Sequence, residues 1–107
     1  MLITFHPFLI HYSSFDPEYF FLSWDQDTVD HIANHRVSPE EVEQVLFNDY
    51  DIPVIMSGKQ NKYITYGKTD SGRFLFVVWV SKYRKTRIVT ARDMTKKEKQ
   101  FYRKRKR

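Results

Sequence analysis

The feature that most constrains this fold is residues 73–81, RFLFVVWVS, a run that is apolar at nearly every position. Successive side chains of a strand point to opposite faces, so a strand that is apolar on both faces is covered on both sides. The run is therefore predicted to be the central strand of a sheet. Further strands are predicted around it, over residues 52–56, 62–69 and 86–92.

Two helices are predicted before these strands. Residues 25–34 carry Val29 and Ile32 on an apolar stripe with helical spacing. A second helix begins at a strong start signal and is expected to end near Asn48. Ser38 is a good N-cap residue, Pro39 suits the first turn, and Glu41 completes a capping box.

A second capping box, Thr95 with Glu98, marks the start of a C-terminal helix that Phe101 and Tyr102 are expected to anchor. The strands follow one another without intervening helices, which is typical of an α+β domain. The predicted fold has two N-terminal helices, an antiparallel β-meander of about four strands, and the C-terminal helix. A short extra strand near residues 21–24 is an optional addition.

Charge divides the chain into two unequal halves. Residues 1–51 hold one basic and ten acidic residues, a net charge of −9, whereas residues 52–107 hold seventeen basic and three acidic residues, a net charge of +14. So dense a cluster of one sign usually marks a phosphate-rich partner. Two interpretations that need no phosphate-rich partner stay open. In one, the acidic half folds over the basic half and neutralises it, and in the other the terminal run RKRKR is only a frayed, solvated tail.

Several kinds of chemistry find no support in the residues. The chain has no cysteine, which excludes disulfides and thiolate metal sites and fits a reducing, cytoplasmic location. It has no G-x-S-x-G motif, no glycine-rich phosphate loop and no apolar run long enough for a membrane. Asp27, His31 and His35 can share one helix face, but the Glu that follows the first His of a zinc protease is absent. No metal or cofactor is predicted.

The predicted sheet does combine cations with aromatic side chains, which suits single-stranded RNA. Trp79 lies in the most apolar run and is expected in the core. Arg92 ends a strand at the start of the last helix, where backbone N–H groups favour an anion, so it is the best candidate for a phosphate contact. The alternative for Arg92 is a structural ion pair with Asp93 or Glu98.

Residues 24–47, 62–80 and 87–106 contain the patterns H-x-V-S-P-E-E-V and T-A-R-D-M-T-x-x-E-K. In this order they resemble the BrnT-type toxins, RelE-like ribonucleases of bacterial type II toxin–antitoxin pairs. The resemblance covers residues 22–107, which are predicted to form a BrnT-like toxin domain with a RelE-like fold. Residues 1–21 lie outside it and are predicted to be an N-terminal extension of unknown role.

The resemblance implies a metal-independent endoribonuclease that arrests growth and is neutralised by a cognate antitoxin of the ribbon-helix-helix type. That antitoxin also binds the operon's DNA, so DNA contact is expected only through it. In such enzymes the RNA 2′-OH attacks the adjacent phosphate in line, and catalysis rests on positioning and charge stabilisation. The catalytic candidates are Arg92, for the pentacovalent phosphate, and His35, Glu98 and Tyr102, for proton transfer. The RNA-binding candidates are Lys68, Arg73, Arg87, Tyr66, Lys96, Lys97 and Arg103.

One departure from the family pattern is Arg36, which stands where the family usually has glycine. If that position requires positive φ, an arginine there costs stability. Two non-catalytic interpretations also stay open. One is a nucleic-acid-binding module that keeps the scaffold without the chemistry, and the other is a basic surface for an acidic antitoxin segment. Residues 103–107 are expected only to attract RNA by their charge (electrostatic reach), without a role in the fold.

Overall fold

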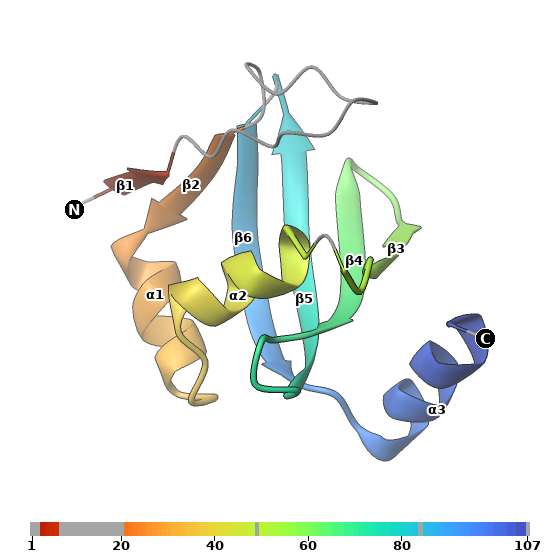
Figure 1. Cartoon of the computed structure of the whole chain (residues 1–107). Helices are drawn as coiled ribbons and strands as arrows, with labels where there is room; N and C mark the ends of the chain where they lie inside the picture. The colour runs from red at the N-terminus through yellow and green to blue at the C-terminus, as the bar shows by residue number, and fades with distance from the viewer. Residues whose placement is uncertain (1–2, 7–20, 49, 84, 107) are drawn as a thin grey trace.

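The computed structural model describes residues 3–6, 21–48, 50–83 and 85–106, which form a six-stranded sheet with helices before and after the meander (Figure 1). The predicted α+β class is confirmed. No helix in this part of the chain is long and apolar enough to cross a membrane. The elements are β1 (Ile3–His6), β2 (Phe21–Asp25), α1 (Gln26–Ala33), α2 (Pro39–Leu46), β3 (Val54–Ser57), β4 (Lys62–Lys68), β5 (Phe74–Lys82), β6 (Lys85–Asp93) and α3 (Lys96–Arg105).

The strands lie in the order β1-β2-β6-β5-β4-β3. From β3 to β6 each strand pairs antiparallel with the next, so the predicted meander is confirmed, with β5 in the interior. β2 is the optional strand, and it adds a parallel pair with β6 in which Ser23 faces Arg87. β1 pairs antiparallel with β2, so part of segment 1–21 belongs to the sheet. The division into an extension (1–21) and a domain (22–107) stays a prediction.

Helices α2 and α3 begin at the predicted capping boxes. Ser38 Oγ accepts a hydrogen bond from the backbone N–H of Glu41, and the Glu41 carboxylate accepts one from the N–H of Ser38, at 3.2 and 3.0 Å. Thr95 and Glu98 make the same reciprocal pair at 3.2 and 2.8 Å. The second box fixes where α3 leaves the end of β6. α2 ends at Leu46, slightly earlier than predicted.

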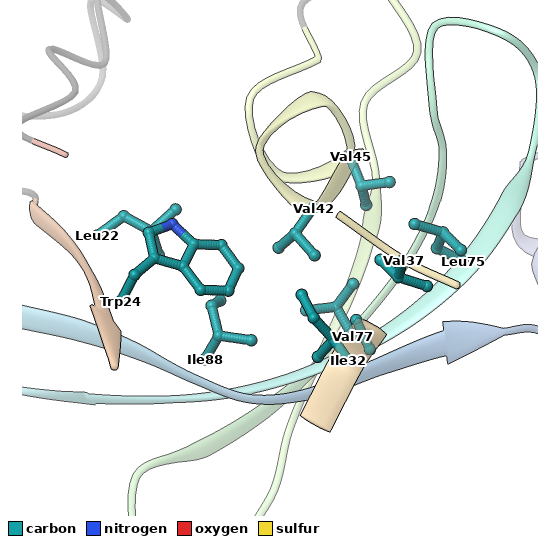
Figure 2. Packing of buried hydrophobic residues seen from close by; sticks show 10 residues of the cluster. Leu22, Trp24, Ile32, Val37, Val42, Val45, Leu75, Val77 and Ile88 are labelled. Atoms are coloured by element: carbon teal, nitrogen blue, oxygen red, sulfur yellow. The ribbon is translucent and has the colours of Figure 1, made fainter. Parts of the chain in front are cut away.

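The core lies between one face of the sheet and helices α1 and α2 (Figures 1 and 2). Burying each large apolar side chain there contributes about 1.5–3 kcal/mol. α2 approaches β4 so closely that a Cβ on Gly67 would lie 2.8 Å from Cγ1 of Val45. The buried cluster contains Leu22, Trp24, Ile32, Val37, Val42, Val45, Leu75, Val77, Ile88 and Ala91.

The second face of the sheet is only partly covered. Phe101 of α3 packs against Tyr66 with ring centroids 5.0 Å apart, and Tyr102 packs against Phe74 at 5.9 Å. Farther along β5, Val78 and Val80 are only half-buried. Within residues 73–81, Leu75 and Val77 are therefore buried on the side of α1 and α2, whereas the other side is only partly covered. The prediction of full cover on both sides is wrong for the second face, because the short α3 packs only near the start of β5.

Candidate functional site

Arg92 lies on the second face of the sheet, at the end of β6. The strand register places Tyr66, Phe76 and Arg92 in one row across β4, β5 and β6. The Arg92 guanidinium lies 4.0 Å from the centroid of the Phe76 ring, a cation–π contact. The Tyr66 ring lies between those of Phe76 and Phe101, at 5.6 and 5.0 Å. Arg92 thus lies beside a cluster of three aromatic rings, two from its own row and the third from Phe101 of α3.

Arg92 and Glu98 form a bidentate ion pair, with N–O distances of 2.8 and 3.0 Å. This is the structural pair that the sequence left open as the alternative for Arg92. Glu98 also closes the capping box of α3, so one carboxylate holds both the helix start and the guanidinium. The Arg92 side chain is still 34% exposed, which leaves part of it accessible to a ligand.

The ion pair fixes the protonation state of Glu98. The hydrogen bond from Arg92 lowers the pKa of Glu98 below its usual value, against the opposing effect of burial. An ionised carboxylate that already accepts from a guanidinium is a poor acid. Burial, and then the charge of Glu98, raise the pKa of Tyr66, so its phenol stays protonated at neutral pH and can donate a hydrogen bond.

Arg73, a predicted RNA contact, is engaged within the protein. Its Nε and Nη2 donate to the Asp93 carboxylate at 2.7 and 3.1 Å, and its Nη1 donates to Glu41 at 3.1 Å. It also donates to the backbone carbonyls of His35 and Arg36. Arg73 therefore ties the loop after α1 to α2 and to the end of β6. Its role in RNA binding stays a prediction.

The same loop contains Arg36, whose φ is +60°. This is the left-handed region that the family's glycine would adopt without strain. The expected conflict at this position is therefore present. The Arg36 carbonyl accepts from Arg73, which helps to hold the strained backbone.

His31 of α1 lies beside β6, and His35 follows in the loop after α1. His31 Nε2 is 3.0 Å from Oγ1 of Thr90, two residues before Arg92, and the His31 and His35 ring centroids are 5.3 Å apart. The His31 ring therefore borders the end of the strand that carries Arg92, and the His35 ring packs against His31. Among the described residues, the interactions of the His35 side chain do not include Arg92 or Glu98. No cluster of three or more His, Cys, Asp or Glu residues in the described ranges is placed to hold a metal ion.

Tyr102, a predicted proton-transfer residue, is buried at 3% exposure. Its hydroxyl donates to Oδ1 of Asp51 at 3.3 Å. Burial, followed by the charge of Asp51, raises the pKa of Tyr102 to about 12. Asp51 also forms ion pairs with Lys68 and Lys106, both at 3.1 Å. These contacts dock the end of α3 on β4 and on the segment before β3, and they give Tyr102 a packing role.

The other predicted RNA contacts are distributed over the surface. Arg87 is exposed near the far end of β6 from Arg92, and Lys96, Lys97 and Arg103 are exposed on α3. Trp79 is only partly buried and packs against the edge of the core, with its Nε1 donating to Oγ1 of Thr65 at 2.7 Å, so the core prediction is confirmed only in part. Sequence reasoning did not identify Phe76 and Phe101 as the rings around the site. Their pairing with Tyr66 appears only in the strand register and the docking of α3.

Comparison with known proteins identifies one family. Residues 24–98 match the model of a family described as the ribonuclease toxin, BrnT, of type II toxin–antitoxin systems. The matched range contains the whole Tyr66, Phe76 and Arg92 row, together with Glu98, His31 and His35. A search of curated proteins finds no significant match.

Proposed function

Because this chain belongs to the BrnT family of ribonuclease toxins of type II toxin–antitoxin systems, we propose that it is a metal-independent endoribonuclease that cleaves RNA to arrest growth. The observation that carries the proposal is the Arg92 guanidinium, held over the Phe76 ring by its pair with Glu98 and still partly open to solvent. A planar guanidinium of this kind binds a phosphodiester through paired N–H groups.

The proposed reaction is an internal transfer of the phosphoryl group. The RNA 2′-OH attacks the adjacent phosphorus and the bond to the 5′-oxygen breaks, giving a 2′,3′-cyclic phosphate and a 5′-OH. The proton of the 2′-OH passes to a base, and the departing oxygen takes one from an acid. Arg92 stabilises the charge on the pentacovalent phosphate, which is the larger part of catalysis in such a site.

His35 is the proposed proton-transfer group, because an imidazole changes charge near neutral pH. This role requires the RNA to extend from Arg92 to the loop after α1, which carries His35. Glu98 acts in this scheme as a positioning residue, since its carboxylate is ionised and committed to Arg92 and Thr95. The protonated phenol of Tyr66 is the proposed hydrogen-bond donor to an oxygen of a phosphate bound at Arg92, because the two residues share one row of the sheet.

Cleavage of labelled RNA by the purified protein, in the presence of EDTA, tests the proposal. Arg92→Gln should lower the rate on the order of 10²–10³-fold, the usual effect of losing one donor to a charged transition state. Lys104→Gln is the matched control, because it removes the same charge from an exposed position on α3 that is not among the RNA-binding candidates. Equal cleavage by Arg92→Gln and wild type, with both folded by circular dichroism, would show that the assignment of Arg92 is wrong.

A second candidate is a binding module without catalysis. It is favoured by the internal pairing of Arg92 with Glu98 and of Arg73 with Asp93 and Glu41, because both guanidinium groups already hold carboxylates. Such a protein would bind RNA with a steep salt dependence and form no cleaved product.

The proposed protein partner is a cognate antitoxin of the ribbon-helix-helix type, through which alone the toxin would contact DNA. Co-purification of the toxin with the product of a neighbouring reading frame, followed by loss of RNA cleavage in the complex, is the expected result. A neighbouring product that binds the chain and leaves cleavage unchanged would contradict this role.

A further inference from the structure

We propose that the pocket between α3, β4 and β5 is a second anion site, which binds an RNA phosphate next to the one that is cleaved. The proposal rests on the proposed function, because it takes RNA as the ligand. The pocket has a volume of about 220 Å³ and is lined by Asp51, Lys68, Phe74, Tyr102, Arg103 and Lys106.

The charge of the pocket favours an anion. Its lining has three cationic side chains and one carboxylate, so it is positive by two charges. Arg103 has no carboxylate partner among the described residues, and its guanidinium lies 5.2 Å from the centroid of the Phe74 ring. Lys68 and Lys99 approach the same ring at 5.8 and 5.5 Å. The cations therefore converge on one aromatic surface.

The pocket already holds an oxyanion of the protein's own. The Asp51 carboxylate accepts from Lys68 and Lys106 at 3.1 Å each and from the Tyr102 hydroxyl at 3.3 Å. Burial raises the pKa of Asp51, and the hydrogen bonds from the two lysines lower it by more, so the carboxylate stays ionised. The same three donors suit the oxygens of a phosphate. Asp51 is thus an internal competitor for the donors that an RNA phosphate would use.

The pocket is separate from the Arg92 site and close to it. Lys68 and Phe74 form the cross-strand row next to that of Tyr66 and Phe76. Two residues along a strand span about 7 Å, which is on the scale of one nucleotide of RNA backbone. An RNA strand whose cleaved phosphate lies at Arg92 can therefore place a neighbouring phosphate in the pocket.

The test compares two variants that each remove one charge from neighbouring positions of α3. Arg103 lines the pocket and Lys104 does not, so Arg103→Gln and Lys104→Gln have the same effect on the general field. Binding is measured by fluorescence anisotropy with 2′-O-methyl RNA, which cannot be cleaved. Arg103→Gln should weaken binding by on the order of tenfold more than Lys104→Gln. It should also lower the slope of log K against log salt by about 0.7, as expected for one lost phosphate contact.

The substitution Asp51→Asn should change RNA affinity in the opposite direction to Arg103→Gln. It removes the competing carboxylate and should tighten RNA binding several-fold, although the fold loses two ion pairs and becomes less stable. A purely structural role of Asp51 would lower stability without raising affinity. Equal affinities of Arg103→Gln and Lys104→Gln, or weaker binding by folded Asp51→Asn, would overturn the proposal. A response to an acidic peptide and not to RNA would also overturn it and assign the pocket to a protein partner.

These measurements stay informative if the protein proves not to cleave RNA. The probe is uncleavable, so the affinities report on the pocket alone. Cleavage assays of the Arg92 variant report on the proposed reaction. If the protein does not cleave RNA but the Asp51 and Arg103 variants change RNA affinity as expected, the chain is an RNA-binding module with this pocket. If it cleaves RNA but those variants bind RNA like their controls, the proposed function stands and the second anion site is wrong.

Discussion

At the scale of single residues, Arg36 is the clearest point of strain. Its φ of +60° puts an arginine in a conformation that favours glycine, and its carbonyl is held by Arg73. Arg36→Gly should therefore raise the free energy of unfolding by about 1 kcal/mol, after the greater flexibility of glycine in the unfolded chain is counted.

Urea unfolding of wild type, Arg36→Gly and Arg36→Ala measures this effect. Alanine keeps the strain and removes the long side chain, so it should leave stability nearly unchanged. A glycine variant that is no more stable than the alanine variant would contradict the backbone argument. If the strain serves a function, the more stable glycine variant should lose some RNA cleavage.

Single residues also show where prediction from sequence succeeds and where it stops. The capping boxes at Ser38 and Thr95 were predictable because both partners lie within three residues. The role of Arg73 was not, because its partners Glu41 and Asp93 lie 32 and 20 positions away. From sequence, Arg73 is simply a cation at a strand start. Only the fold shows that each of its nitrogen atoms already has an acceptor.

At the scale of elements, α3 is more firmly docked than its composition indicates. Residues 103–107 were expected to provide only electrostatic reach, but Lys106 forms an ion pair with Asp51 and donates to the backbone carbonyl of Ile52. That expectation is wrong for Lys106, because the helix continues to Arg105 and brings the lysine over the segment before β3.

Lys106→Gln should therefore destabilise the fold by about 1 kcal/mol, the usual size for a partly exposed ion pair with an added hydrogen bond. Lys104→Gln, which removes the same charge from an exposed position, should change stability by less than about 0.5 kcal/mol. The measurement is the midpoint of urea unfolding for each variant. Equal midpoints would show that Lys106 contributes no more to stability than Lys104 does, as expected for a solvated tail.

In the sheet, as with Arg73, the features set by local sequence were predictable and the long-range contacts were not. The meander from β3 to β6 was predictable from alternation of apolar residues and turn positions along one stretch of chain. The strand near residues 21–24 was recognisable as a candidate, but its neighbour was not. Its partner β6 lies more than sixty positions later, and no local pattern specifies that parallel pairing.

At the scale of the whole molecule, stability should depend on pH at both extremes. Burial and Asp51 raise the pKa of Tyr102 from 10.0 to about 12, so the folded state favours the neutral phenol. That contribution is complete below pH 10 and is lost as pH rises toward 12, on the order of 2–3 kcal/mol in total. Wild type should lose stability over this range.

Unfolding by urea at pH 9, 10 and 11 tests this dependence, with Tyr102→Phe as the control. The phenylalanine variant lacks the ionising group, so its stability should fall less over the same range. A parallel fall in both proteins would assign the effect to other groups, such as Tyr66, whose pKa is also raised.

At low pH the relevant groups are Asp51, Asp93 and Glu98, whose pKa values are lowered in the folded state. Their contribution is present above the ordinary carboxylate pKa of about 4 and is lost as pH falls below it. Stability should therefore be greatest between these two ranges.

The parallel pairing of β2 with β6 has a consequence for the time course of synthesis. Strands so far apart in sequence close a long loop, which slows folding, and the second strand must first be made. The docking of α3 adds a later condition, because Lys106 must reach Asp51. A nascent chain that ends near residue 93 still lacks α3, the helix whose Glu98 holds Arg92. The complete Arg92 site therefore forms only once α3 has been synthesised and has docked on the sheet, so it is a late part of the domain to appear.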